Sequence, residues 1–160
     1  MLYRYILPVV TLIAIIFAIV LSVQKNRISF SCSGEYSEDA IYDGIRVNSQ
    51  VNIMSSVSRS QKLYVNYDGY INYNSKSYHV NREVTFAYEI LDRYAGLVRI
   101  TPVFQIRNTS DTLNSKEVES RLLGIENKGR LIRIWRISER IVLVGNPYAP
   151  IFSCILLGDG

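Results

Sequence analysis

The residues of this chain whose chemistry is easiest to predict are its two cysteines. Cys32 lies in "ISFSCSG" (28–34) and Cys154 in "IFSCILL" (151–157), each after the dipeptide Phe-Ser. The first stretch alternates apolar with polar residues, which is typical of a half-buried strand, and places Cys32 on the face of Phe30. In the second stretch Cys154 shares a strand face with Phe152 and Leu156, so both thiols are predicted to face the core. If the first and last strands are neighbours, a disulfide between them is geometrically allowed. The alternative is two unrelated buried thiols in a cytosolic domain.

Groups suited to catalysis or metal binding are scarce. The single histidine, His79 in "SYHVN", has alternating neighbours, and a lone strand histidine is more often structural than catalytic. The sequence contains no G-x-S-x-G, phosphate-binding glycine loop or H-x-x-x-H spacing. With one histidine and two cysteines that are expected to pair, the usual soft ligands cannot assemble a metal site. We therefore predict no catalytic residue, no bound metal and no cofactor.

Twelve tyrosines are the unusual feature of the composition. The segment "VNYDGYIN" (65–72) predicts a hairpin with a two-residue type I′ turn at Asp68-Gly69, across which Tyr67 and Tyr70 would face each other. The tyrosines that crowd this hairpin are Tyr64, Tyr67, Tyr70, Tyr73 and Tyr78. Such side chains can line a ligand cavity or a partner surface, although tyrosine also simply favours strands. They are a candidate ligand or partner surface without a named ligand.

The amino-terminal segment, residues 1–26, differs in composition from the rest. Residues 5–23 carry no charge and are mostly apolar, and a helix needs about 20 such residues to cross a bilayer. We predict a transmembrane anchor in residues 1–26, with the membrane crossed by residues 5–23. The alternatives are a cleavable signal peptide, a buried core helix or a type IV pilin stem.

The orientation of this anchor does not follow from charge, because Arg4 and the amino terminus oppose Lys25 and Arg27. The cysteine pair favours an oxidising compartment, where a disulfide persists. Residues 27–160 are long enough for one domain with one core. We predict a single-pass protein with this domain on the oxidising side of a membrane.

Nucleic acid is not a predicted partner. The net charge is only +4 and no basic run occurs. The arginines near the carboxyl end alternate with apolar residues, which is typical of the solvated face or rim of a strand: Arg130, Arg133, Arg136 and Arg140.

The fold predicted for residues 27–160 is mainly β, because period-two alternation runs through almost all of it. Strands are expected in 28–34, 45–57, the hairpin at 65–72, 84–90, 98–106, 129–138, 140–146 and 151–157. Pro102 removes a donor, so its strand is expected to be bulged or at an edge. One short helix is expected over 113–124, with Asn114 as its N-cap and Gly124 at its carboxyl end. Together these elements predict an N-terminal transmembrane helix followed by an antiparallel barrel-like domain of about eight strands with one late helix.

In this layout the chain resembles the small ToxS-like and FidL-like membrane proteins of enteric and related bacteria. The resemblance covers the anchor "LPVVTLIAIIFAIVLSV", the first-strand cysteine in "FSCSG", the central "DG" hairpin and the last-strand cysteine in "FSCILL". It implies a companion of a ToxR-like or CadC-like regulator, which joins a cytoplasmic winged-helix DNA-binding domain to a periplasmic sensor domain by a single span. In the family the companion's periplasmic domain binds and stabilises that of the regulator, and some pairs form a lipocalin-like barrel that takes bile-type amphipathic ligands.

The resemblance thus implies a single-pass protein of the bacterial inner membrane, with a short cytoplasmic start in residues 1–26 and its domain, residues 27–160, in the periplasm. It implies a non-enzymatic accessory protein that stabilises or modulates a membrane-bound regulator in signal transduction, with an amphipathic molecule such as a bile acid as a candidate ligand. A free-standing, membrane-anchored lipocalin-like binder of small apolar molecules is the alternative. A third hypothesis is an envelope enzyme, whose turnover would depend on His79. No individual ligand residue can be carried over from the family.

Overall fold

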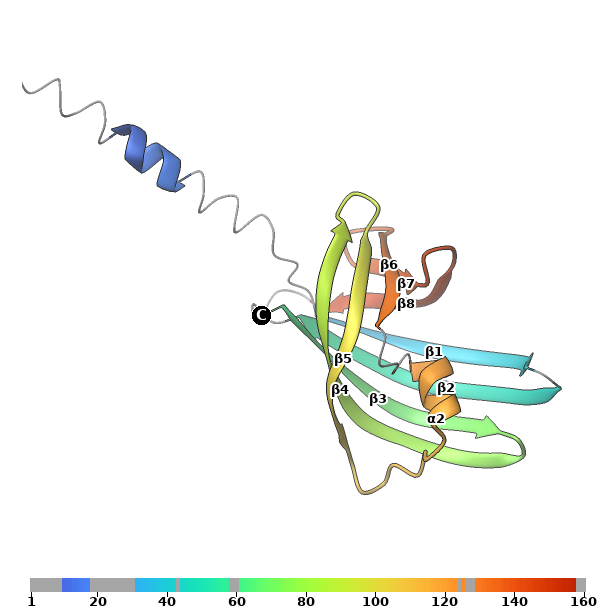
Figure 1. Cartoon of the computed structure of the whole chain (residues 1–160). Coiled ribbons are helices and arrows are strands. Elements are labelled where there is room, and N and C mark those ends of the chain that lie inside the picture. The colour runs from blue at the N-terminus through green and yellow to red at the C-terminus, as the bar shows by residue number, and fades with distance from the viewer. Residues whose placement is uncertain are drawn as a thin grey trace, which may run out of the picture.

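The computed structural model describes residues 10–17, 31–42, 44–57, 61–123, 125 and 129–157. Its elements are β1 (Ser31–Tyr42), β2 (Ile45–Val57), β3 (Lys62–Tyr73), β4 (Lys76–Asp92), β5 (Leu97–Arg107), α2 (Lys116–Leu123), β6 (Arg130–Arg136), β7 (Ile141–Gly145) and β8 (Pro150–Leu157). Each strand pairs antiparallel with the next, and β8 returns to pair with β1 (Figure 1). The predicted mainly-β fold, an eight-stranded antiparallel barrel with one short late helix, is confirmed.

The alternation of apolar and polar residues in the sequence corresponds to an alternation of buried and exposed side chains in the strands. In β2, Val47, Val51 and Ile53 are buried while the residues between them on the other face are exposed. The apolar face of each strand lines the inside of the barrel, so the core forms within the closed sheet.

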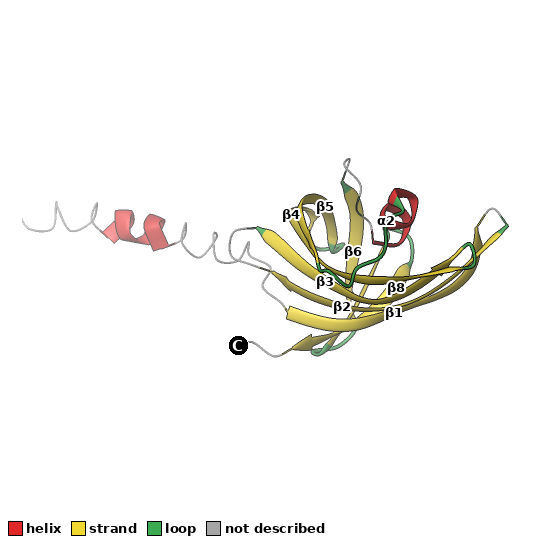
Figure 2. Ribbon diagram, turned by 90° about the horizontal axis from the view of Figure 1, so that it is seen from below, coloured by secondary structure: helices red, strands yellow, loops and turns green. Residues whose placement is uncertain are grey.

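The barrel is closed by strands at one end only. β1 pairs with β8 through residues 31–34, and β5 pairs with β6 through residues 97–100. Within the described chain, residues 35–42 of β1 and 101–107 of β5 therefore have a strand partner on one side only. There the sheet is a curved trough, and α2 lies over its concave side (Figure 2).

A disulfide joins Cys32 of β1 to Cys154 of β8, as the sequence predicted, with the two Cα atoms 5.6 Å apart. The register places Gly34 opposite Cys154, so the bond runs diagonally across the two strands on their inner face. A Cβ atom at Gly34 would lie 2.2 Å from the carbonyl oxygen of Ser153. Glycine at position 34 therefore lets β8 approach β1 closely enough for this pairing.

The turn predicted at Asp68-Gly69 is wrong. Both residues lie inside β3, and the chain turns instead at Asn74 and Ser75, which have φ angles of 50° and 60°. A Cβ atom at Gly69 would lie 2.1 Å from the carbonyl oxygen of Gln50 on β2. The glycine thus allows a close contact between two strands and does not form a turn. The dipeptide Asp-Gly alone does not distinguish these two uses of glycine.

The predicted helix is present but shorter, covering Lys116–Leu123. Its N-cap is Ser115 and not Asn114, because Ser115 Oγ accepts a hydrogen bond of 3.4 Å from the backbone N–H of Val118. Gly124, the predicted terminator, lies outside the described residues.

The bulge expected near Pro102 is confirmed by a register shift between β4 and β5 opposite this residue.

The predicted anchor, residues 5–23, lies largely outside the described residues. The described part is a helix over residues 10–17. Its exposed apolar side chains are Val10, Leu12, Ile13, Ile15, Ile16 and Phe17. Among the residues that the structure describes, no helix has both the length and the apolar character needed to cross a membrane.

Candidate ligand-binding cavity

The barrel contains a cavity of about 680 Å³ at the end where β6, β7 and β8 close the sheet. Every strand contributes to its lining, mostly with aliphatic and aromatic side chains. Tyr148, in the loop between β7 and β8, belongs to the lining and is 94% exposed, so the cavity reaches the surface beside this loop. A largely apolar cavity of ~300–1,000 Å³ with a few polar groups is the usual form of a small-molecule site.

Tyr67 supplies a buried hydroxyl to this cavity. Its hydroxyl donates a hydrogen bond of 3.1 Å to the carbonyl oxygen of Leu123, the last residue of α2. Burial raises the pKa of Tyr67 far above its ordinary value, against the opposing positive charges of Arg130 and Arg82. The hydroxyl therefore stays protonated at neutral pH and acts as a donor.

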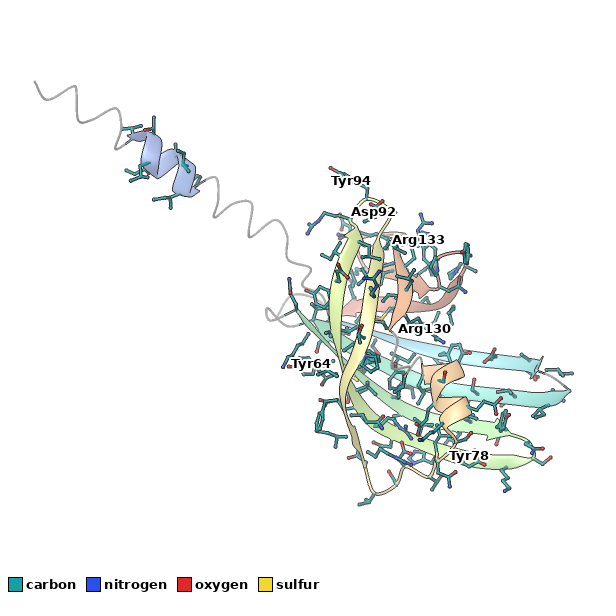
Figure 3. All side chains as sticks on the ribbon, in the orientation of Figure 1. Tyr64, Tyr78, Asp92, Tyr94, Arg130 and Arg133 are labelled. Atoms are coloured by element: carbon teal, nitrogen blue, oxygen red, sulfur yellow. A yellow bond between two sulfur atoms is a disulfide. The ribbon has the colours of Figure 1, made fainter. Side chains whose placement is uncertain are left out.

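Arg130 is the charged residue of the cavity. Arg130 pairs with Ile100 of β5, and Ile132 pairs with Val98. Both β5 residues are buried in the core. Arg130 and Ile132 therefore lie on the inner face of β6. Arg130 Nη2 donates a hydrogen bond of 3.1 Å to the carbonyl oxygen of Ser120 in α2. Figure 3 shows Arg130 at the start of β6, beside α2.

The arginines of this region divide between the two faces. The prediction that all four lie on a solvated face or rim is wrong for Arg130, because the register turns it inward. Arg133 is half-buried on the outer face, where its guanidinium lies 5.2 Å from the centre of the Trp135 ring. Arg136 and Arg140 are exposed, as expected.

The five hairpin tyrosines do not form one surface. Tyr67 lines the cavity, while Tyr73 and Tyr78 are partly buried against the core elsewhere in the barrel. Tyr70 is on the outer face, with its ring centre 4.9 Å from that of His79. Tyr64 also lies on the outer side of the barrel (Figure 3). The hairpin brings these residues together in sequence, but strand alternation sends them to opposite faces.

Three other tyrosines line the cavity and were not singled out from the sequence: Tyr36, Tyr88 and Tyr148. The pattern did contain a signal for one of them, because Tyr88 shares its strand face with Val84 and Phe86, which are fully buried. Tyr148 sits in a loop, where alternation carries no information.

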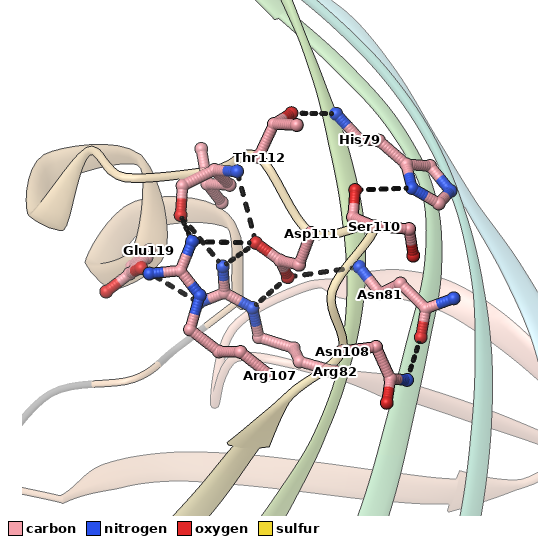
Figure 4. Close-up of polar contacts among 10 residues, drawn as sticks. His79, Asn81, Arg82, Arg107, Asn108, Ser110, Asp111, Thr112 and Glu119 are labelled. Carbon is pink, nitrogen blue, oxygen red and sulfur yellow. Dashed lines mark hydrogen bonds and ion pairs between the residues drawn. The ribbon is translucent and has the colours of Figure 1, made fainter.

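His79 has a structural setting. Its backbone N–H donates to Thr112 Oγ1 at 2.9 Å, and its Nδ1 atom lies 3.0 Å from the carbonyl oxygen of Ser110 (Figure 4). His79 is not among the residues that line the cavity. Within the described part of the chain, no three residues of the His, Cys, Asp and Glu types are grouped so that they could hold a metal ion.

A buried ion network holds α2 and the segment before it against the trough. Arg82 of β4 donates to both carboxylate oxygens of Asp111, at 2.7 and 2.6 Å, and to Glu119 of α2 at 2.8 Å (Figure 4). Arg107 Nη2 also donates to Asp111, at 3.0 Å. Because α2 supplies Leu123 to the cavity and accepts hydrogen bonds from Tyr67 and Arg130, the network positions one wall of the site.

The pKa of Asp111 reflects this network. Burial acts to raise the pKa, but the hydrogen bonds from Arg82, the backbone N–H of Asn81 and Arg107 hold the pKa below its ordinary value. Arg82 is affected in the opposite sense: burial acts to lower its pKa, and its bonds to Asp111 and Glu119 raise it. Both groups are therefore charged at neutral pH.

Comparison with known proteins gives a family match. The model of the FidL-like putative membrane protein family matches residues 69–154, more than half of the chain. The matched region runs from β3 to β8 and includes Arg82, Asp111, Arg130 and Cys154. No curated protein matches the chain.

Proposed function

Because the chain belongs to the FidL-like family, we propose that it is a non-enzymatic, membrane-associated binding protein whose barrel takes a small, largely apolar molecule. The observation that carries this proposal is the cavity of about 680 Å³, whose lining combines aliphatic and aromatic side chains with a few hydroxyls and one arginine. That combination offers a large apolar contact area and few polar groups to orient the ligand.

In this proposal the protein is a single-pass component of the bacterial inner membrane with its barrel in the periplasm. Two observations support it. Residues 5–23 have the composition and about the length of a membrane span, and the described part of that segment exposes apolar side chains such as Ile13 and Phe17. The Cys32–Cys154 disulfide is the kind of bond that persists in an oxidising compartment.

Filling the cavity is expected to weaken ligand binding strongly. Val144 of β7 is a half-buried lining residue, so Val144→Trp places an indole in the space that a ligand would occupy. Full-length protein in detergent is titrated with the neutral fluorescent probe N-phenylnaphthylamine. We expect saturable fluorescence enhancement with the wild type and a loss of about tenfold or more in affinity with the variant.

The matched control is Ile155→Trp, which adds the same indole on the exposed outer face of β8, where Ile155 is 58% exposed. This variant should bind the probe like the wild type. Equal binding by Val144→Trp and the wild type, or no saturable binding by the wild type, would contradict the proposed cavity function.

A second candidate function is that of an accessory subunit for a ToxR-like or CadC-like regulator. The observation that favours it is the edge of β5 at residues 101–107, which has no strand partner on one side within the described chain. Val103, Phe104 and Ile106 lie along this edge and are 60, 62 and 49% exposed. An unpaired edge with exposed apolar side chains suits the addition of an extended segment from the regulator's periplasmic domain. Binding only the folded regulator would stabilise it by linkage.

Charges on this edge are expected to weaken the pairing. In the double variant Phe104→Asp and Ile106→Asp, two carboxylates replace the apolar contacts, and about tenfold less regulator should be recovered with the tagged protein from detergent extracts. Met54→Asp is the matched control, because Met54 is 51% exposed on β2, which is paired on both sides. If the double variant recovers as much regulator as Met54→Asp, the β5 edge is not the docking surface; if the wild type recovers none, the accessory function fails.

A further inference from the structure

The outer face of the barrel carries a row of apolar side chains across four neighbouring strands. Ile141 of β7 pairs with Ile155 of β8. Ile155 also pairs with Ser33 of β1, which in turn pairs with Met54 of β2. Paired residues share one face of a sheet, and Ile155 and Met54 are 58 and 51% exposed, so the row faces outward. It forms an apolar strip that contains one serine.

Two more apolar side chains extend this row toward the end of the barrel. Ile137 is 60% exposed, and its backbone N–H donates a hydrogen bond of 3.0 Å to the carbonyl oxygen of Ile141. Leu157 lies two residues beyond Ile155 on the same face of β8 and is 42% exposed. We call these five residues the anchor-side patch: Met54, Ile137, Ile141, Ile155 and Leu157. A contiguous group of exposed apolar side chains marks a surface that binds a protein or a membrane.

The anchor-side patch lies at the end of the barrel where β1 begins. Ser31, the first residue of β1, pairs with Leu157, and Figure 1 shows the start of β1 beside the end of β8. In the sequence, residues 24–30 separate Ser31 from the uncharged stretch 5–23. A segment of this length spans at most about 25 Å even when it is fully extended. If residues 5–23 cross a bilayer, the patch is therefore held within reach of the membrane surface in every molecule.

Basic residues border the patch. Lys62 begins β3, and Arg136 and Arg140 flank the turn between β6 and β7; all three are exposed. Arg140 is next to the patch because its carbonyl oxygen accepts a hydrogen bond of 2.8 Å from the backbone N–H of Leu156. The same turn contains one acidic residue, Glu139. Apolar side chains bordered by lysine and arginine suit a lipid surface with negative head groups.

The outer face of β1 becomes acidic with distance from Ser31. Glu35 accepts a hydrogen bond of 2.7 Å from Gln50, and Asp39 forms an ion pair of 2.7 Å with Arg46. Negative head groups would repel uncompensated carboxylates on this part of the strand. The distribution of charge thus favours contact with lipid at the end of the barrel near Ser31 and not along the whole of β1.

We propose that the anchor-side patch lies against the bilayer surface, with its apolar side chains among the lipid head groups and the basic residues level with negative ones. This inference rests on the proposed anchor, although an anchor does not require the contact, because the barrel could stand free of the membrane on residues 24–30. The short connection also decides for lipid over a protein, since it keeps the bilayer at a high effective concentration. Tyr148 follows the opposite end of β7, so the cavity would open away from the lipid surface.

Spin labels on the full-length protein in liposomes of phosphatidylethanolamine and phosphatidylglycerol test this contact. Both native cysteines are joined in the disulfide, so a nitroxide attaches to one introduced cysteine. Power saturation measures its collisions with oxygen, which concentrates in the bilayer, and with a water-soluble nickel complex. We expect the ratio of oxygen to nickel collisions to be about threefold or more higher in Ile155→Cys than in Ile41→Cys. Ile41 is the matched control, because it is 72% exposed at the far end of β1.

Charges in the patch should remove the contact. With the label at position 155, the double variant Ile137→Asp and Ile141→Asp should lower the ratio to the value at position 41, because negative head groups repel the new carboxylates. The control places the same two charges at exposed residues outside the patch, Ile41→Asp and Ile106→Asp, and should leave the ratio at position 155 unchanged. Circular dichroism of the labelled proteins checks that each variant is folded.

The outcomes distinguish failure of the contact from failure of the anchor. Equal ratios at positions 155 and 41, in protein that stays with the liposomes after an alkaline wash, overturn the contact and leave the anchor intact. A ratio that survives in the folded double variant does the same. Strong dipolar coupling between labels at position 155 of two molecules would assign the patch to a second copy and also overturn the inference. If the alkaline wash releases the full-length protein, the proposed anchor itself fails.

Discussion

Without its disulfide, the protein is expected to lose about 4–5 kcal/mol of unfolding free energy. The Cys32–Cys154 bond closes a loop with a sequence separation of 122, and in the chain-entropy model a loop of that length is worth about this much. Most domains are stable by only ~5–15 kcal/mol, so the double variant Cys32→Ala and Cys154→Ala should be close to unfolding at physiological temperature.

The effect should be this large because little else joins β1 to β8. Their pairing covers only residues 31–34 and 154–157. Both cysteines are essentially inaccessible to solvent and form a small separate cluster with Val142. Loss of the bond therefore also exposes apolar surface next to the cavity wall at Phe152, which packs against this cluster.

Urea unfolding of the full-length protein, followed by circular dichroism, measures this loss. Wild-type protein is compared with and without a reductant that breaks the bond in the unfolded state. The double variant provides the control, because its midpoint should not respond to reductant. A double variant with the midpoint of the oxidised wild type would show that the bond contributes nothing to stability.

Features that repeat along the chain were predictable from sequence. Period-two alternation in 45–57 or 84–90 arises because one strand face meets the core and the other meets water, so it reports burial directly. The pairing of Cys32 with Cys154 followed from the same pattern, since two inward thiols on the first and last strands meet once the sheet closes.

Features that depend on which segments lie side by side were not predictable. Gly69 is needed because β2 passes within contact distance, and the dipeptide Asp68-Gly69 cannot show that contact. Arg130 belongs to an alternating segment, and the sequence does not show which of the two strand faces points into the barrel. The pairing of Arg130 with Ile100 settles this, and it places Arg130 on the inner face. The tyrosines of the β3–β4 hairpin were expected to share one surface because the turn was placed at Asp68-Gly69. The strand instead continues through these residues, and its alternation divides the tyrosines between two faces.

The environment of the buried Arg82 was only partly predictable from the sequence. It occupies the inward position between Val80 and Val84, where alternation predicts an apolar residue. A charged residue in that position requires a partner inside the protein, but Asp111 and Glu119 are far away in sequence. Local pattern can therefore predict that such a partner exists and cannot name it.

Replacing Arg82 should have an effect of similar size to loss of the disulfide. Arg82→Leu removes the guanidinium from a pair in which both side chains are inaccessible to solvent, and leaves the Asp111 carboxylate buried. Breaking one partner of a buried pair costs about 3–5 kcal/mol. We expect the lower end of that range, because Arg107 still donates to Asp111. Arg46→Leu is the matched control: its bond to Asp39 is also 2.7 Å long, but it lies at the exposed surface, so stability should change little.

The pH dependence separates loss of the ion pair from simple loss of packing. The folded-state pKa of Asp111 is below its unfolded value of about 3.9, so the stability that Asp111 contributes is present above that pH and is lost as the pH falls through the folded pKa. In Arg82→Leu the carboxylate keeps its burial but loses its main hydrogen-bond donor, so its folded pKa rises and its penalty is relieved by protonation at acidic pH. The difference in unfolding free energy between wild type and variant should therefore be largest near neutral pH and shrink toward pH ~4 and below. A difference that is the same at neutral and acidic pH would assign the loss to side-chain volume and exclude the charge as its cause.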